Sequence, residues 1–293
     1  MDGALKNPES LSKIKLHLFL NKSADSFFSG SYRSIFRGSG LDFDEVRQYT
    51  DGEDSRLIDW NVSSRMKEPY KKVYKEEREL VLFLIIDFSA SVFSGENKMT
   101  KKDQIALSAA LLSLGAAGSD DRVGAVFFTD KIEKFIHPGK GKKHALGIIK
   151  NILTFSPDNK GSDLGLAIRT ARKSLKCRGT CVILSDFRTR GFWKDLSLLK
   201  KRHDVIAVKI TDSQDYTFPG RSLVRVSDPE TGGFLYARGG SEKFRREYSE
   251  FWDMEHFSWI RSCRKAGIST LTMATEDDVY KKFLSFFNRR RRR

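Results

Sequence analysis

The chain has 293 residues, a hydrophobic fraction of 39% and a formal net charge of +15 at pH 7. This length allows one large domain, or a core with a smaller attached unit, and no apolar run approaches the ~20 residues that a membrane-spanning helix needs. The three cysteines lack the spacing of a disulfide framework or a zinc site, which indicates reduced thiols. The polar N-terminal sequence MDGALKNPES shows no secretory signal, so we expect a cytoplasmic protein.

The first 79 residues, 1–79, are expected to form a strand-rich segment with charged turns. Within this segment we expect Trp60 to pack on the core. We also expect Asp59 to pair with a nearby arginine, Arg56 or Arg65.

The stretch Leu80–Val92, which reads LVLFLIIDFSASV, organises the rest of the chain. Its unbroken apolar run predicts a strand that is buried on both faces of an α/β sheet. Asp87, Ser89 and Ser91 follow on the loop that leaves this strand, where such sheets place ligands. Three hard oxygen donors in five residues can surround a small divalent cation such as Mg²⁺. Serine residues there can also simply cap the next helix, so the triplet alone does not establish a metal site.

Strands and helices alternate along the remainder of the chain. Strand patterns cover 70–77, 122–129, 131–136, 180–184, 203–210 and 269–274, and a hairpin is predicted from 222–226 and 234–238. Helical spacing covers 101–118, 142–153, 163–174, 193–200, a long segment capped by Ser241, and 277–287. This alternation predicts a doubly wound, mostly parallel α/β sheet over 80–288, with a hairpin insertion near 220–240.

Two later loops carry further oxygen donors. Ser162 precedes the helix predicted over 163–174, and Asp186 follows the buried strand predicted over 180–184. We interpret both loops as leaving the C-terminal ends of strands, as the Asp87 loop does, so the three loops are expected to meet at one edge of the sheet. An alternative for Ser162 is that its hydroxyl group caps the helix that follows.

The D-x-S-x-S loop resembles the metal-ion-dependent adhesion site of the von Willebrand factor A domain. This resemblance implies a metal site made of Asp87, Ser89, Ser91, Ser162 and Asp186, in which the serines bind the ion directly and the aspartates act partly through water. The ion is expected to be Mg²⁺ or Mn²⁺. Ser162 stands where that family usually has threonine, so the hydroxyl oxygen is kept.

The run GSGLDFDEVRQYTDGEDSRLIDWNVSSR, followed by YKKVYKEERE and the D-x-S-x-S strand, resembles the bacterial family called domain of unknown function fifty-eight. The motif residues that carry this resemblance, without a known role, are Gly40, Phe43, Arg47, Tyr49, Asp59, Trp60 and Arg65. Members of this family join such a segment to a von Willebrand factor A-like domain. Their genes typically lie beside those of MoxR-type AAA+ ATPases, which implies such an ATPase and an acidic protein ligand as partners.

We therefore expect a protein-interaction module rather than an enzyme. A phosphatase of the haloacid-dehalogenase type would need a second aspartate where Ser89 stands, and neither a P-loop nor a G-x-S-x-G elbow occurs in the chain. The five histidines are scattered and lack metal spacing. A Mg²⁺-dependent hydrolase stays as a weaker alternative.

The positive charge leaves a further alternative open. The C-terminal run Arg289–Arg293 supplies five positive charges, is expected to be disordered, and leaves +10 on the rest of the chain. A basic surface of this kind suits an anionic partner such as nucleic acid, and it can also be merely solvated.

Overall fold

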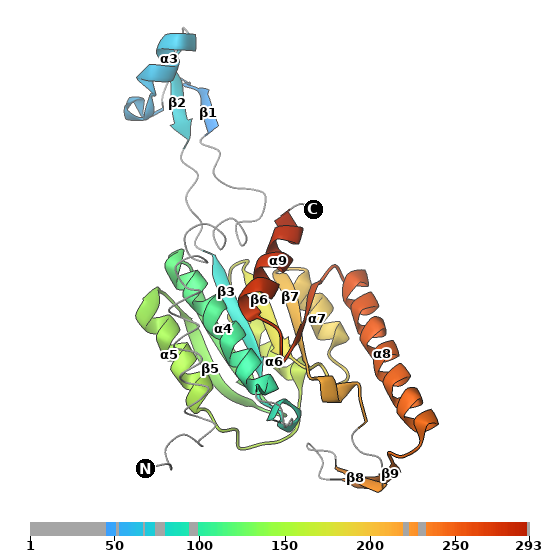
Figure 1. The fold of residues 1–293 in the computed structure, drawn as a ribbon. Helices are drawn as coiled ribbons and strands as arrows, with labels where there is room; N and C mark the ends of the chain where they lie inside the picture. The colour runs from blue at the N-terminus through green and yellow to red at the C-terminus, as the bar shows by residue number, and fades with distance from the viewer. Residues whose placement is uncertain are drawn as a thin grey trace, which may run out of the picture.

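The computed structural model describes residues 45–50, 53–66, 68–73, 80–93, 99–218, 223–227 and 233–291. Its centre is a six-stranded sheet with the order β10-β7-β6-β3-β4-β5 (Figure 1). Neighbouring strands are parallel except for the edge strand β5, which is antiparallel to β4. The strands are β3 (Val81–Asp87), β4 (Arg122–Phe128), β5 (Ile132–Gly139), β6 (Thr180–Ser185), β7 (Asp204–Thr211) and β10 (Ser269–Ala274).

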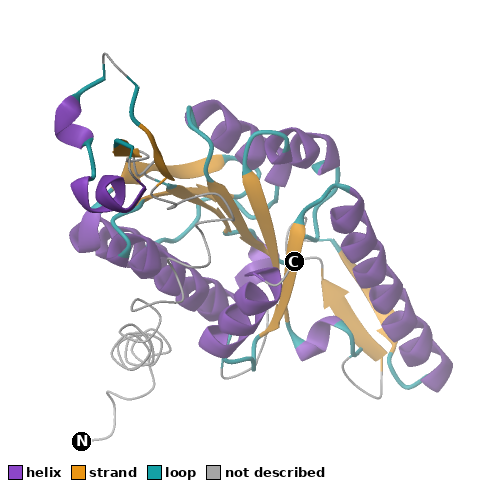
Figure 2. Cartoon of the chain, turned by 90° about the horizontal axis from the view of Figure 1, so that it is seen from above, coloured by secondary structure: helices purple, strands orange, loops and turns teal. Residues whose placement is uncertain are grey.

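The helices cover both faces of this sheet (Figure 2). One core layer contains α4 (Lys101–Gly118), α5 (Gly141–Thr154) and α9 (Val279–Arg291). The opposite layer contains α6 (Leu164–Ser174), α7 (Trp193–Lys200) and α8 (Glu242–Lys265). The doubly wound, mostly parallel α/β fold predicted from the sequence is therefore confirmed.

The position of the central strand β3 explains why its sequence is an unbroken apolar run. Leu82, Leu84 and Ile86 pack into the layer of α4, α5 and α9, whereas Phe83 and Ile85 pack into the layer of α6, α7 and α8. All five side chains are at most 2% exposed. Because successive side chains of a strand point to opposite faces, a strand covered on both faces must be apolar at every position.

Local signals fix where the helices begin. Thr100 caps α4 by accepting a hydrogen bond from the Asp103 amide, and the Asp103 carboxylate accepts one from the Thr100 amide at 3.0 Å. Ser241 caps α8 through the amide of Phe244. Such reciprocal and single caps satisfy amides that the first helical turn leaves without partners, which is why the sequence located both starts.

Two further units complete the described structure. Strands β1 (Glu45–Gln48) and β2 (Tyr70–Val73) form an antiparallel pair with the short helix α3 (Trp60–Met66) between them, and β8 (Leu223–Ser227) and β9 (Phe234–Arg238) form an antiparallel hairpin. Short 3₁₀ turns lie at 55–57, 90–93 and 213–215. Within the described ranges, no helix has the length and apolar character needed to cross a bilayer.

The expected burial of Trp60 is wrong. Its side chain is 71% exposed, because it opens α3 in the unit that contains β1 and β2 instead of packing on the core of the six-stranded sheet. The Asp59 carboxylate accepts hydrogen bonds from the amides of Asn61 and Val62 at 3.0 and 3.3 Å. Asp59 therefore caps the start of α3, whereas the sequence led us to expect an ion pair with an arginine. Arg56 pairs instead with Asp54 at 3.2 Å.

The arginine run is also not simply a free tail, because α9 continues through Arg291. Arg290 forms an ion pair with Asp204 at the start of β7, and Arg289 donates to the Ser285 carbonyl of its own helix at 3.4 Å. The guanidinium of Arg290 and the ammonium of Lys200 hold the pKa of Asp204 below its ordinary value of 3.8, although burial opposes them. The partly buried carboxylate of Asp204 is therefore the partner of Arg290 at the end of α9, which the sequence pattern does not reveal.

We predict that Arg290→Gln lowers the thermal midpoint slightly, by the equivalent of about 0.5 to 1 kcal/mol, because the ion pair is partly exposed. Arg289→Gln is the control, since it removes the same charge but leaves Asp204 paired. A group with a lowered folded-state pKa contributes stability above its unfolded pKa and loses it as the pH falls through the folded value. The difference between the two variants should accordingly be present at pH 7 and vanish well below pH 3.8. Equal midpoints at pH 7 would contradict the prediction.

Candidate metal centre at the C-terminal edge of the sheet

The strand order places a crevice beside the end of β3. The strand that follows β3 in the chain, β4, lies on one side of it, and β6 lies on the other side. Loops that leave β3 and β6 therefore diverge to opposite faces of the sheet. In open α/β sheets, ligands bind at such a point.

The first loop is held by the Asp87 carboxylate, which is 1% exposed. One of its oxygens accepts a hydrogen bond from the Ser89 amide at 2.8 Å, and the other accepts one from the Ser185 hydroxyl at 2.6 Å. The hydroxyl oxygens of Ser89 and Ser91 lie 3.1 Å apart, and both residues are buried. Asp87, Ser89 and Ser91 are thus gathered in one buried turn, as the sequence predicted.

Backbone contacts tie the other two loops to this turn. The Ala90 amide donates to the Lys160 carbonyl at 2.9 Å, which joins the first loop to the second. The Thr189 hydroxyl donates to the Ser162 carbonyl at 2.9 Å, which joins the second loop to the third. Together with the bond between Ser185 and Asp87, these contacts connect all three predicted loops.

The expectation that the Ser162 loop leaves a strand is wrong, because this loop connects helices α5 and α6. Ser162 also does not cap α6. The cap is Asp163, whose carboxylate accepts a hydrogen bond from the Leu166 amide at 2.8 Å. The Ser162 hydroxyl is buried and has no hydrogen-bond partner among the described residues. Buried polar groups are nearly always satisfied, and leaving one unsatisfied costs about 1–3 kcal/mol. An unsatisfied hydroxyl next to a loop of oxygen donors is the kind of group that a ligand would complete.

The buried carboxylates of Asp87 and Asp186 repel each other. Burial and the negative charge of Asp186 raise the pKa of Asp87 to about 7, although hydrogen bonds from Ser185 and Ser89 lower it. Asp186 is 3% exposed, and one of its oxygens accepts the Arg188 amide at 3.2 Å. A cation between these two groups would favour their ionised forms.

The structure adds Lys101, which the sequence analysis missed. The side chain of this lysine is 1% exposed, and its ammonium lies 3.4 Å from Asp186 Oδ2 and 2.8 Å from Asp215 Oδ1. Asp215 also pairs with Arg188 at 2.8 Å. Lys101 is simply the first residue of α4 in the sequence, and no local pattern distinguishes it from its neighbour Lys102, so only the tertiary structure could reveal its position.

The donor set fits a hard divalent cation. No group of three or more His, Cys, Asp or Glu side chains that could hold a metal ion occurs in the part of the chain that the structure describes. A metal site here therefore depends on hydroxyl oxygens, which together with carboxylates suit Mg²⁺ or Mn²⁺. The unsatisfied hydroxyl of Ser162 and the raised pKa of Asp87 both agree with such an ion.

The predicted motif residues of the N-terminal segment lie in the other unit. Arg47 pairs with Glu53, and the Tyr49 hydroxyl donates to the Glu53 carbonyl at 2.7 Å. Asp59 and Trp60 begin α3, and Arg65 lies in its last turn. Gly40 and Phe43 lie outside the described residues.

Comparisons with known proteins gave relatives without an assigned activity and structures of low sequence identity. An uncharacterized protein from Mycobacterium tuberculosis is 26% identical over 294 aligned residues, which cover 99% of this chain and 92% of that protein. An aerotolerance-related membrane protein from Bacteroides fragilis aligns with 73% of this chain and 98% of its own, at 13% identity and a TM-score of 0.49. The VWA domain of SpRpn10 aligns with 71% of this chain and 94% of its own, at 10% identity and a TM-score of 0.39.

A family model gives the assignment. The model described as "Protein of unknown function DUF58" matches residues 45–256, from the first strand of the N-terminal unit to the middle of α8. The match contains all three loops of the predicted metal site, and it also contains the five motif residues that follow Phe43. Because it covers more than half of the chain, the protein belongs to the DUF58 family.

Proposed function

We propose that the chain is a cytoplasmic protein-interaction module that uses a divalent cation to bind a carboxylate of an acidic protein partner. The observation that supports the proposal most directly is the buried, unsatisfied hydroxyl of Ser162, whose loop is joined to the Asp87 turn by the hydrogen bond from the Ala90 amide to the Lys160 carbonyl. The ion would be Mg²⁺ or Mn²⁺. This is a binding function, in which no bond of the partner is broken.

Each site residue has a defined part in this proposal. Ser89, Ser91 and Ser162 would hold the ion directly, and Asp87 and Asp186 would act partly through water. When bound, the cation would supply an electrophilic position that a partner's carboxylate can fill. The Ser185 hydroxyl fixes the orientation of Asp87, because it donates to the carboxylate oxygen that Ser89 does not use.

Lys101 changes the charge balance of the site. Its ammonium already compensates Asp186 and Asp215, so a divalent cation beside it would leave the surroundings more positive than two carboxylates alone would allow. A more positive site attracts an anionic ligand more strongly. The same ammonium repels the metal ion, so Lys101 should weaken ion binding while favouring the acidic partner.

The resemblance of the N-terminal motif and the metal loop to this bacterial family supports the partner. We propose that the chain works as an adaptor for a MoxR-type AAA+ ATPase in the assembly or remodelling of other proteins. Its acidic ligand would then belong either to that ATPase or to a client protein.

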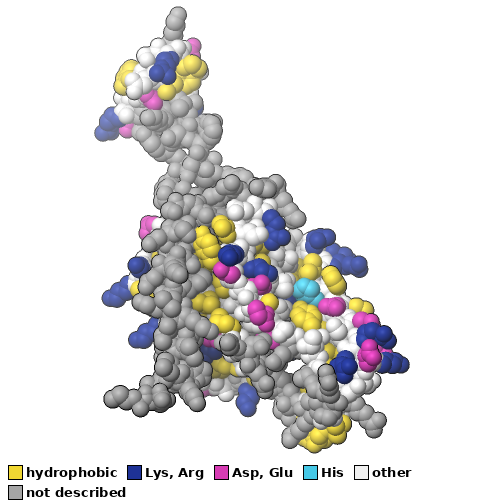
Figure 3. All heavy atoms as spheres, in the orientation of Figure 1, with side chains coloured by type: hydrophobic (Ala, Val, Ile, Leu, Met, Phe, Trp, Pro, Cys, Tyr) yellow, Lys and Arg dark blue, Asp and Glu magenta, His cyan; other side chains and the backbone are white. Residues whose placement is uncertain are grey.

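The net charge of +15 keeps nucleic acid as a competing partner. On the face seen in Figure 3, however, dark blue basic and magenta acidic side chains are interspersed. A protein that contacts several phosphates loses affinity steeply as salt rises. A steep salt dependence with a nucleic-acid ligand would favour this alternative, and Mg²⁺-dependent turnover that Asp87→Ala abolishes would favour a hydrolase.

The first test concerns the metal. Ser162→Ala should weaken binding of Mg²⁺ or Mn²⁺ at least tenfold by calorimetry, because it removes a direct oxygen ligand. Its thermal midpoint should not fall, since the hydroxyl makes no hydrogen bond in the described structure. Ser113→Ala is the matched control, because Ser113 has a buried hydroxyl without a partner in α4 and is not a proposed ligand. Equal binding by wild type and Ser162→Ala, or no binding by either, would contradict the proposal.

Lys101→Met should instead strengthen metal binding by about tenfold, because it removes a positive charge next to Asp186. The variant should also be less stable than wild type, since Asp186 and Asp215 lose their counter-charge. Lys102→Met is the control for the change in net charge, as its ammonium reaches the Phe155 carbonyl at 3.4 Å and the ring of Phe93. Calorimetry on the folded fraction of each variant measures the metal affinity. Unchanged or weaker metal binding in Lys101→Met would rule out repulsion between the Lys101 ammonium and the ion.

The third test concerns the partner. Asp186→Asn should lower the affinity for a purified MoxR-type ATPase at least tenfold, or by about 1.4 kcal/mol, and EDTA should do the same to the wild type. A double substitution of the exposed Lys142 and Lys143 should have a smaller effect at physiological salt, because exposed charges are screened. If the lysine variant loses binding while Asp186→Asn and EDTA change nothing, an electrostatic surface replaces the metal as the anchor.

A further inference from the structure

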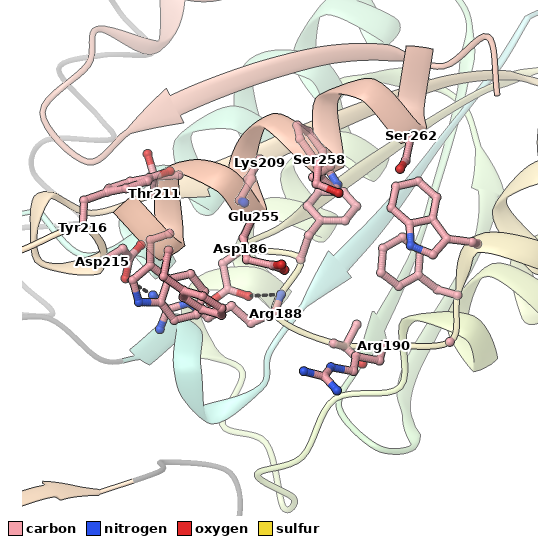
Figure 4. A pocket seen from close by; sticks show the side chains of 18 residues that line it. Asp186, Arg188, Arg190, Lys209, Thr211, Asp215, Tyr216, Glu255, Ser258 and Ser262 are labelled. Atoms are coloured by element: carbon pink, nitrogen blue, oxygen red, sulfur yellow. Dashed lines mark hydrogen bonds and ion pairs between the residues drawn. The ribbon is translucent and has the colours of Figure 1, made fainter. Parts of the chain in front are cut away.

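A pocket of about 380 Å³ lies beside the metal loops. It is bounded by the loop after β6, the end of β7, the 213–215 turn and one side of α8 (Figure 4). Asp186 belongs to both the pocket and the proposed metal site, since it lines the pocket and is the first residue of the loop after β6. The pocket is therefore a second concave site next to the first, built mainly from elements that contribute no proposed metal ligand.

The walls of the pocket are aromatic. Its lining includes Phe187, Phe192, Trp193, Tyr216, Phe251, Trp252 and Trp259. The rings of Phe187 and Trp259 have centroids 5.0 Å apart, and Phe251 is 50% exposed at the pocket. Met254 and Phe257 are also exposed on the same helix, at 64% and 67%. Exposed apolar side chains on a helix that borders a pocket are typical of a surface that binds another protein.

The charged groups that line the pocket are balanced in number, three basic and three acidic, but not all of them are paired. Asp215 is paired with both Lys101 and Arg188, and Asp186 is paired with Lys101. Of the remaining lining groups, Lys209 and Arg190 form no ion pair within the ranges that the structure describes. Glu255 is exposed on α8 and is the remaining acidic lining residue.

Lys209 is the most informative of these cations. It projects from β7 toward the pocket, and its ammonium lies 5.4 Å from the ring centroid of Trp259. No hydrogen bond to this ammonium occurs among the described residues. Burial and the neighbouring Arg188 lower the pKa of Lys209, although Asp186, Asp215 and Glu255 oppose them. A half-buried cation without a direct counter-ion gains by binding an anion.

The indole groups also lack acceptors. The N–H groups of Trp252 and Trp259 are buried and make no hydrogen bond in the described structure. Trp259 is 6% exposed and lines the pocket, and the ring of Trp252 is covered by the Arg188 guanidinium, whose central carbon is 4.7 Å from the ring centroid. Because these N–H groups are covered by the surrounding side chains, the indole rings form walls of the pocket. The ammonium of Lys209 is therefore the donor that an incoming carboxylate can pair with.

We propose that this pocket binds a carboxylate of a peptide segment whose neighbouring side chain is aromatic or apolar. The carboxylate pairs with Lys209, and the apolar side chain packs against Trp252 and Phe251. That the ligand belongs to a protein rests on the proposed interaction function, but binding in this pocket does not require the metal ion. The pocket would give the acidic partner a second anchor beside the metal loops and would select for the sequence around its carboxylate.

The test uses three small probes and the indole N–H resonances of the full chain. The probes are acetyl-Ala-Phe with a free carboxylate, acetyl-Asp-Phe amide, and the neutral acetyl-Ala-Phe amide. The first two distinguish a terminal carboxylate from an acidic side chain. The chain has four tryptophans, and the variants Trp60→Phe, Trp252→Phe and Trp259→Phe assign the three signals that the test uses.

At least one carboxylate probe, added in excess of about 1 mM, should shift the signals of Trp252 and Trp259. It should leave the signal of Trp60, on α3, in place, and the neutral probe should have at least a tenfold weaker effect. Lys209→Met should weaken the carboxylate probe at least tenfold, while Lys194→Met, at an exposed lysine of α7, should not.

Two controls separate this proposal from the metal site. Binding of the carboxylate probe should persist in EDTA and in Ser162→Ala, whether or not the wild-type chain binds Mg²⁺. Equal shifts from the neutral probe, full affinity in folded Lys209→Met, or no shift from any probe would overturn the proposal. Loss of the shifts in EDTA alone would mean that the carboxylate binds at the metal loops and not in the pocket.

Discussion

The burial of β3 on both faces is the constraint on which the rest of this structure depends. A strand that is apolar at every position must lie between two layers of helices, and its neighbours β4 and β6 must pair with it on either side. The chain continues from β3 to β4 on one side, and β6 lies on the other side of β3. The loops after β3 and β6 therefore diverge, which leaves space at the C-terminal end of β3, where its last residue, Asp87, lies. The polar chemistry of the molecule is therefore located by its most hydrophobic segment.

Charge compensation governs what that edge can do. Asp87 and Asp186 are both almost completely buried, and burial together with the negative charge of Asp186 disfavours the ionised form of Asp87. The buried ammonium of Lys101 compensates the charges of Asp186 and Asp215, and hydroxyl groups donate hydrogen bonds to Asp87. The two halves of the site thus differ, because one carboxylate has a fixed counter-charge and the other has only hydrogen bonds. A divalent ion would act mainly on the half that lacks a counter-charge.

Helix α8 extends this edge into a larger surface. One side of it packs on the sheet through Trp259 and Cys263, while Phe251, Met254 and Phe257 remain exposed. The pocket between α8 and the end of β7 lies next to Asp186, so a single acidic segment of a partner could reach both places.

Sequence patterns alone predicted the strands and helices around the six-stranded sheet, the α/β class and the residues of the three loops, but they missed helix α3 in a segment expected to be strand-rich. The correct predictions were possible because apolar periodicity and helix caps such as Thr100 and Asp103 act over a few neighbouring residues. The sequence indicated Ser162 as the possible cap of α6, whereas the cap is Asp163; both are good capping residues, and only the hydrogen bond to the Leu166 amide distinguishes them. The exposure of Trp60 was likewise decided by which unit its helix joins.

Only the tertiary structure revealed the long-range ionic contacts. Lys101 lies 85 residues from Asp186 and 114 from Asp215, and Arg290 lies 86 residues from Asp204. No local pattern marks these partners, because their pairing follows from how strands and helices pack and not from spacing along the chain. The same holds for Lys209 and Trp259, which a strand and a distant helix bring to one pocket. Local propensity thus fixed the elements, and packing fixed which of their charges meet.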